Sequence, residues 1–146
     1  MSGGHHQSVT LELPLERETT APAAARRAVA GWLAEAGWDA AAHQPSVDTA
    51  QLVTSELVTN AIRYGMEPIT LTVRMISSGL RLEVHDADRR ANPELQHPDD
   101  RTPGGRGLLL VSGSADEWGW HLVDNGKVVW AEVALVESDR APNFVS

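Results

Sequence analysis

Two pairs of alternating apolar runs, each joined by a short turn, constrain the fold of this chain most strongly. The first pair occupies residues 69–84 and turns near Gly79, and the second occupies residues 117–135 and turns at an Asn-Gly sequence ending at Gly126. Strands joined by such short turns run antiparallel. The sequence therefore predicts an antiparallel sheet built from two hairpins.

Two helices are predicted ahead of these hairpins from apolar residues that recur at spacings of three and four. The first covers residues 21–36, with a proline near its start and a glycine after its end. The second, longer helix is expected to be capped by Ser46 or Asp48 and to end at Gly65. A strand over residues 9–15 precedes both helices and is expected to end near its proline.

The order of these elements predicts the fold class. Paired antiparallel strands with segregated helices indicate an α+β two-layer sandwich, in which a mixed but mostly antiparallel sheet carries its helices on one face. A chain of 146 residues is long enough for one domain with a substantial core. We expect that domain over residues 9–136, with a disordered tail over residues 1–8 and a loose tail over residues 137–146.

The composition excludes several classes of function. The net charge of −8 argues against direct binding to nucleic acid or to anionic membranes, which favour clustered Lys and Arg. The absence of cysteine removes thiol catalysis, disulfides and Cys-ligated zinc. No apolar run approaches the roughly 20 residues that span a bilayer, and the N-terminus lacks a signal-peptide pattern. We therefore expect a cytoplasmic protein without a membrane segment.

A carboxylate and a carboxamide lie one turn apart on the longer predicted helix. Glu56 and Asn60 are four residues apart, so both side chains project from the same side. An amide oxygen is a hard ligand suited to Mg²⁺, and a carboxylate can orient or deprotonate a nucleophile. The two residues could equally belong to the solvated side of the helix, so the downstream residues decide between these interpretations.

Two further segments carry candidate chemistry. Asp86 ends an apolar strand, where it can form a turn or accept a hydrogen bond from an exocyclic amine such as that of adenine. The polar loop over residues 87–103 is too long for a routine connection, and Asp88 at its start is expected to be exposed. Residues 104–107, Gly-Gly-Arg-Gly, then open a helix, where backbone N–H groups favour phosphate. Taken alone, such a glycine-rich turn is weak evidence.

In order and spacing, these segments resemble the motifs of the GHKL, or Bergerat-fold, ATPases. Residues 56–61, Glu-Leu-Val-Thr-Asn-Ala, look like the N box of that family, residues 84–88 like its G1 box and residues 104–108 like its G2 box. The resemblance runs from about Leu11 to Val136. The G1 box departs from the usual Asp-x-Gly-x-Gly because it contains no glycine, so we expect weaker or more mobile nucleotide binding.

The resemblance implies ATP and Mg²⁺ as cofactors and a role for each matched residue. Glu56 would act as the general base, Asn60 would ligate Mg²⁺, and Asp86 would accept the amine of adenine. The loop over residues 87–103 would form the ATP lid. The residues near the phosphates would be Arg101 from the lid and the G2-box residues Gly104, Gly105, Arg106, Gly107 and Leu108.

Within that family the chain looks most like the small stand-alone anti-sigma-factor serine kinases of the RsbW/SpoIIAB type. We expect no room for the dimerisation and phosphoacceptor domain of sensor histidine kinases. The implied function is an ATP-dependent serine/threonine kinase that binds a sigma factor and phosphorylates an anti-anti-sigma partner, as a homodimer. One alternative is a binding module that responds to ATP without phosphoryl transfer, and another is a plain α+β interaction domain without nucleotide.

Overall fold

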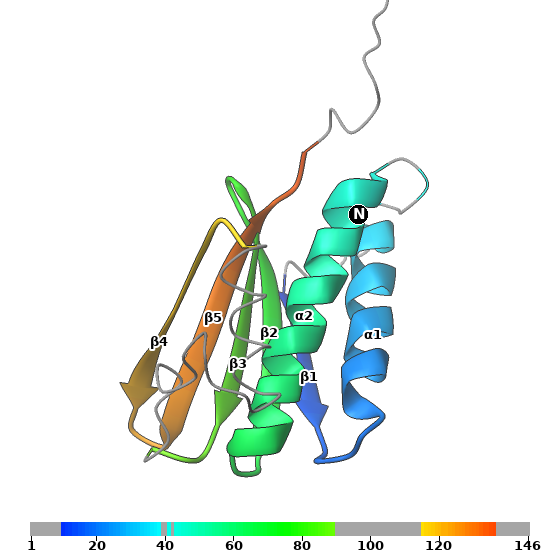
Figure 1. Ribbon diagram of the computed structural model, residues 1–146. Helices are drawn as coiled ribbons and strands as arrows, with labels where there is room; N and C mark the ends of the chain where they lie inside the picture. Colours follow the sequence, from blue (N-terminus) through cyan, green and yellow to red (C-terminus); the bar gives the residue numbers. More distant parts are fainter. Residues whose placement is uncertain (1–9, 39–40, 42, 90–114, 137–146) are drawn as a thin grey trace, which may run out of the picture.

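The protein folds as an open five-stranded sheet with two helices packed on one of its faces (Figure 1). The computed structural model describes residues 10–38, 41, 43–89 and 115–136. The strands are β1 (Thr10–Leu15), β2 (Ile69–Ile76), β3 (Gly79–Asp86), β4 (Glu117–Val123) and β5 (Gly126–Ala134), and the helices are α1 (Ala21–Glu35) and α2 (Gln44–Tyr64).

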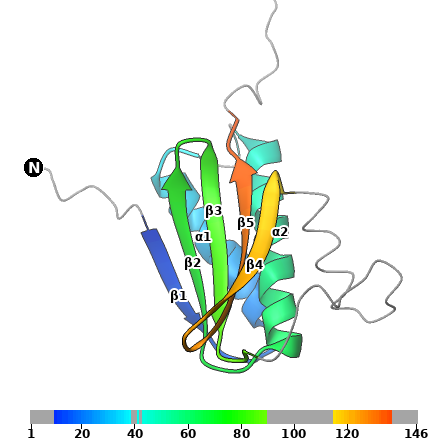
Figure 2. The same ribbon diagram turned by 90° about the vertical axis from the view of Figure 1, so that its left-hand side faces the viewer.

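The two predicted hairpins form the centre and one edge of the sheet. The strand order is β1-β2-β3-β5-β4, and each neighbouring pair is antiparallel. The two hairpins meet where β3 pairs with β5, and Figure 2 shows both helices behind the sheet. The predicted α+β sandwich with helices on one face is confirmed, and every ladder between the described strands is antiparallel.

The core lies between the sheet and the helices because apolar side chains alternate along the central strands. On β2 and β3 the side chains that face the helices are fully buried: Ile69, Leu71, Val73, Leu80, Leu82 and Val84. The helices supply the opposite wall with Val29, Leu33, Val47, Val53, Leu57 and Val58. Within the described ranges, neither helix has the length and apolar character needed to cross a membrane.

One expectation about an element end is wrong. α2 begins at Gln44 with His43 as its N-cap, upstream of the expected caps, because a proline occupies its first turn. The Ser46 hydroxyl instead accepts a hydrogen bond from the Val136 N–H at 3.0 Å. β1 ends at Leu15, one residue after Pro14, as expected, and Pro14 pairs with Thr70. A proline is tolerated there because β1 is an edge strand.

Two glycines bring three elements together at one end of the molecule. Gly126, at the start of β5, has φ 152°, and a Cβ atom there would lie 1.8 Å from the Asp86 carbonyl oxygen. Gly65 follows α2, and its Cβ atom would lie 2.5 Å from the Asp86 Cγ atom. Neither position accepts a side chain without a shift of Asp86. The end of α2, the end of β3 and the start of β5 therefore meet around this aspartate.

We predict that Gly31→Ala raises the free energy of unfolding by about 0.5–1 kcal/mol, because alanine loses less backbone entropy in a helix. Gly31 lies on the exposed side of α1, and a Cβ atom there would meet nothing within 4 Å. Chemical denaturation measures the change. Gly126→Ala is the contrasting variant and should destabilise the fold, so equal stabilities of the two variants would contradict this account.

Candidate functional site

Asn60 is a buried polar side chain near the C-terminal end of α2. The residue is only 5% exposed, and its Oδ1 atom has no hydrogen-bond partner among the described residues. A buried acceptor left without a donor costs about 1–3 kcal/mol. Such an atom is typical of a site that an ion, a ligand or a water completes.

A single amide oxygen suits one kind of metal site. Among the described residues, no group of three or more His, Asp or Glu side chains could hold a metal ion. Mg²⁺ in nucleotide sites needs no such cage, because one or two protein oxygens, phosphates and waters complete its coordination. The Asn60 Oδ1 atom therefore fits a Mg²⁺ ion that arrives with a nucleotide.

Glu56 lies one helical turn before Asn60 and is half-buried. Desolvation by burial raises the pKa of its carboxyl above the ordinary value, and the positive charge of Arg26 on α1 opposes that rise. Arg26 also donates a hydrogen bond to the Ser55 hydroxyl at 3.1 Å, which ties α1 to α2. A carboxylate with a raised pKa binds a proton more readily, as a general base must.

Asp86 lies at the centre of a buried hydrogen-bond network and is 2% exposed. Its Oδ1 atom accepts hydrogen bonds from the N–H groups of Met66 at 3.3 Å and Asp88 at 2.8 Å, and from the Lys127 ammonium at 3.1 Å. Its Oδ2 atom lies 2.9 Å from the same ammonium. Asp88 is itself buried, at 8% exposed, so the expectation that it is exposed is wrong.

The helix that carries Glu56 and Asn60 ends directly against Asp86. Gly65 makes this contact, since a Cβ atom there would lie 2.7 Å from the Asp86 Oδ2 atom. The connection is reinforced where the Ala87 N–H donates to the carbonyl oxygen of Met66 at 2.8 Å. The structure thus brings two of the three candidate segments to the same end of the molecule.

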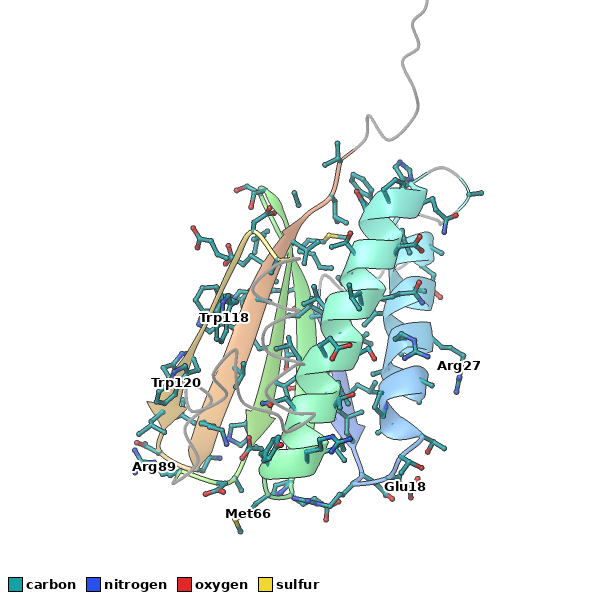
Figure 3. All side chains as sticks on the ribbon, in the orientation of Figure 1. Glu18, Arg27, Met66, Arg89, Trp118 and Trp120 are labelled. Atoms are coloured by element: carbon teal, nitrogen blue, oxygen red, sulfur yellow. The ribbon has the colours of Figure 1, made fainter. Side chains whose placement is uncertain are left out.

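The third candidate segment lies outside the described residues. Its members are Arg101, Gly104, Gly105, Arg106, Gly107 and Leu108. Only the start of the expected lid, residues 87–89, is described. There the Arg89 guanidinium donates to the carbonyl oxygen of Val123 at 2.8 Å, which attaches this start to the β4–β5 turn. Figure 3 labels Arg89 there, with Trp118 and Trp120 along β4.

Sequence reasoning missed Lys127, which shares the site with Asp86. Lys127 is 2% exposed and alternates along β5 with the buried residues Val129, Ala131 and Val133. A lysine at a helix-facing position of a strand is unusual because a buried ammonium needs a partner. That alternation is visible in the sequence and could have singled out Lys127.

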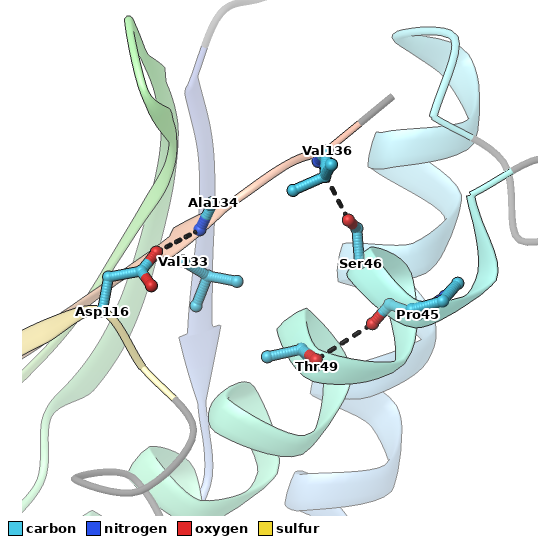
Figure 4. A pocket seen from close by; sticks show the side chains of 7 residues that line it. All are labelled: Pro45, Ser46, Thr49, Asp116, Val133, Ala134 and Val136. Carbon is cyan, nitrogen blue, oxygen red and sulfur yellow. Dashed lines mark hydrogen bonds between the residues drawn. The ribbon is translucent and has the colours of Figure 1, made fainter. Parts of the chain in front are cut away.

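A separate cavity of about 270 Å³ lies at the other end of α2, beside its first turn (Figure 4). Its polar side chains already bond to backbone groups: the Asp116 Oδ2 atom accepts from the Ala134 N–H at 2.7 Å, and the Thr49 hydroxyl donates to the Pro45 carbonyl at 2.9 Å. None of the predicted site residues lines this cavity. These contacts fasten the end of β5 to α2 and do not add to the candidate site.

Comparison with known proteins identifies the family. A sequence model of the histidine kinase-like ATPase domain matches residues 15–133, so the chain belongs to this family. The matched range contains Glu56, Asn60 and Asp86, and membership of an ATPase family implies ATP as the ligand. The resemblance to GHKL ATPases is therefore confirmed.

A solved structure supports the same fold. The crystal structure of the RsbU and RsbW domains of Rv1364c from Mycobacterium tuberculosis is similar with a TM-score of 0.65 and 19% sequence identity. The alignment covers 95% of this chain and 35% of that chain, and at this identity the likeness concerns the fold. The comparison with curated proteins gave no match.

We predict that Arg26→Gln raises the pKa of Glu56 further, because it removes the positive charge that lowers it. Titration of the glutamate carboxyl carbons by NMR measures the shift. The folded state holds this proton more tightly than the unfolded chain, so the carboxyl adds stability as the pH falls through its folded pKa.

Arg27→Gln is the matched control for this prediction. Arg27 is the next residue on α1 and is exposed, and Figure 3 shows it pointing away from α2. Its loss removes the same formal charge and should leave the Glu56 titration close to that of the wild type. Equal shifts in the two variants would mean that Arg26 acts through net charge alone.

Proposed function

We propose that this protein is an ATP-dependent serine/threonine kinase that binds a sigma factor and phosphorylates an anti-anti-sigma partner. The observation that carries the proposal is the unbonded Oδ1 atom of buried Asn60, one turn from Glu56 and on the helix that ends against Asp86. A Mg²⁺-nucleotide site would supply the partner that this atom lacks.

The proposed mechanism gives each described residue one task. Asp86 accepts a hydrogen bond from the exocyclic amine of the base, which fixes the nucleoside end of ATP. Asn60 would hold Mg²⁺, which neutralises charge on the phosphates when it is bound. Glu56 takes the proton of the attacking hydroxyl, and burial has already raised its pKa toward that task.

The phosphates would be held by the segment between β3 and β4. The G2-box glycines Gly104, Gly105 and Gly107 would offer backbone N–H groups, and Arg101 and Arg106 would offer charge. Transfer then depends mainly on positioning the γ-phosphate in line with the hydroxyl, as in other phosphoryl transfers.

The partners follow from the branch of the family that the chain resembles. The fold likeness to a structure described as containing an RsbW domain supports a role in sigma-factor control. The net charge of −8 favours partner surfaces that present basic residues. We extend the proposal to a homodimer in the cytoplasm.

Glu56→Gln should lower the rate of phosphoryl transfer by about 10²–10⁴-fold, because the amide cannot accept the hydroxyl proton. The measurement is transfer of label from γ-labelled ATP to candidate antagonist proteins. Affinity for Mg²⁺-ATP should stay close to that of the wild type, since Glu56 is not assigned to the nucleotide. Wild-type turnover by the glutamine variant would remove Glu56 from the mechanism.

Asn60→Ala should weaken ATP binding in the presence of Mg²⁺ and have little effect when Mg²⁺ is chelated. Titrations with and without Mg²⁺, followed by tryptophan fluorescence, give both affinities. Thr59→Ala changes the neighbouring residue of α2 and serves as the control. Equal Mg²⁺ dependence in the Asn60 variant and the wild type would contradict the metal role.

The same assays separate the kinase from the binding module. A module that responds to ATP without chemistry would bind Mg²⁺-ATP and change its partner affinity, yet transfer no label to any candidate. Failure of the wild-type protein to bind ATP under any condition would refute the nucleotide site as a whole.

A further inference from the structure

A small pocket of about 240 Å³, here called the α1–α2 pocket, opens where the start of α1 meets the last turns of α2. Pro22 and Ile62 supply apolar lining, and Glu18 and Arg63 supply opposite charges. Sites for small molecules usually enclose about 300–1,000 Å³. The pocket is therefore too small for a nucleotide and suits a side chain of a docked protein segment.

The α1–α2 pocket lies beside the proposed general base. Arg63 follows Glu56 by seven residues, so both project from the same face of α2, two turns and about 10 Å apart. On α1, Pro22 precedes Arg26 by one turn. The Arg26 guanidinium in turn donates to the hydroxyl of Ser55, the residue directly before the base. Both helices thus place the pocket next to Glu56.

The loop before α1 is fastened to the end of α2. The Arg17 N–H donates to a Glu67 carboxylate oxygen at 2.8 Å, and the Arg17 guanidinium donates to the carbonyl oxygen of Gly65. Glu18 is the next residue, and its carboxylate accepts a hydrogen bond from the Thr20 hydroxyl at 3.3 Å. These contacts hold the Glu18 side of the pocket in place, so its shape does not depend on a partner.

Arg63 is an exposed cation that the fold leaves available. It forms no hydrogen bond or ion pair with the residues that the structure describes. Its charge suits the last turn of α2, where the carbonyl end of the helix dipole favours a cation. A guanidinium also matches a carboxylate through two parallel hydrogen bonds. Arg63 can therefore bind an acidic side chain that another molecule brings to the pocket.

We propose that the α1–α2 pocket seats the protein segment that carries the acceptor hydroxyl, and that Arg63 binds an acidic side chain near that hydroxyl. The inference rests on the proposed function, because it names a feature of the protein substrate of the same reaction. In that reaction the hydroxyl oxygen bonds to the γ-phosphorus, the bond to the β-phosphate oxygen breaks, ADP leaves and Glu56 takes the proton.

The direction of transfer agrees with this placement. Asn60 and Asp86 are assigned to the nucleotide, on the flank of α2 that faces the end of β3. In-line transfer requires the attacking hydroxyl to lie opposite the leaving ADP. The acceptor consequently approaches Glu56 from the flank toward α1, which is where the pocket opens.

A purely structural role for Arg63 makes a different prediction. If the arginine only complements the helix dipole, its replacement changes stability and leaves the KM for the protein substrate unchanged. If Arg63 docks the substrate, its contact is present before and during transfer alike. Losing such a contact raises KM and leaves kcat unchanged.

The first test measures label transfer from γ-labelled ATP to the candidate antagonist protein that the wild type labels fastest. Arg63→Glu should raise the KM for that protein about tenfold or more, because the new charge repels the acidic side chain. The kcat and the affinity for Mg²⁺-ATP should stay close to those of the wild type. Arg63→Gln should raise KM less, and it carries the test should the glutamate variant fail to fold.

The outcomes of this test separate the two proposals. If the wild type transfers label and the Arg63 variants have its KM, the docking assignment fails while the proposed function stands. A fall in kcat with an unchanged KM would also overturn it, because Arg63 would then act in the chemistry. If the wild type binds ATP but labels no candidate, the kinase proposal fails and this inference fails with it.

Arg27→Glu is the matched control. Arg27 is an exposed arginine of α1 that points away from α2 in Figure 3, and its replacement makes the same change of charge. This variant should keep the KM of the wild type. An equal rise of KM in the Arg27 and Arg63 variants would mean that net charge governs association, which would overturn a specific contact at the pocket.

A charge exchange identifies the contact on the substrate. Acidic residues of the antagonist within about 10 Å of its acceptor hydroxyl are replaced by lysine one at a time, since Arg63 lies that far from the base. One lysine variant should raise KM with the wild-type protein and lower it again with Arg63→Glu. If no lysine variant restores KM with Arg63→Glu, Arg63 does not bind an acidic residue of the substrate.

Discussion

The buried ion pair between Asp86 and Lys127 holds together the end of the protein where the candidate site lies. Asp86 bonds at once to Met66 in the loop after α2, to Asp88 two residues beyond β3, and to Lys127 at the start of β5. Removing one member of a buried pair leaves an uncompensated charge and costs about 3–5 kcal/mol. The pair therefore fixes three chain segments and presents a carboxylate oxygen in one defined place.

Helix α2 connects the hydrophobic core to this site. One side of the helix buries Leu57 and Val58 in the core, and its flank carries Asn60 and Glu56. The positions of Glu56 and Asn60 are consequently set by core packing, which resists displacement. A site built this way is held ready for its ligand by the same contacts that stabilise the fold.

Much of the fold follows from local sequence patterns. The strand pairs, both helices and the end of α2 at Gly65 were predictable because alternation and turn residues act over short distances. The start of α2 was missed although Pro45 marks its first turn, and the Ser46 hydroxyl expected to cap the helix accepts from the distant Val136 N–H instead. The position of Asp86 at the end of a strand was predictable from the sequence. Its ion pair with Lys127 was not, because that contact depends on which strands become neighbours in the sheet. The influence of Arg26 on Glu56 likewise arises only when two helices pack together.

The proline in β1 determines how the sheet can associate with other molecules. An exposed edge strand normally offers a row of N–H and carbonyl groups to any passing strand. Pro14 interrupts that row because it has no N–H to give, so β1 is a poor template for sheet extension. Strand addition at the β1 edge is thereby disfavoured, whereas the opposite edge of the sheet is formed by β4, which contains no proline.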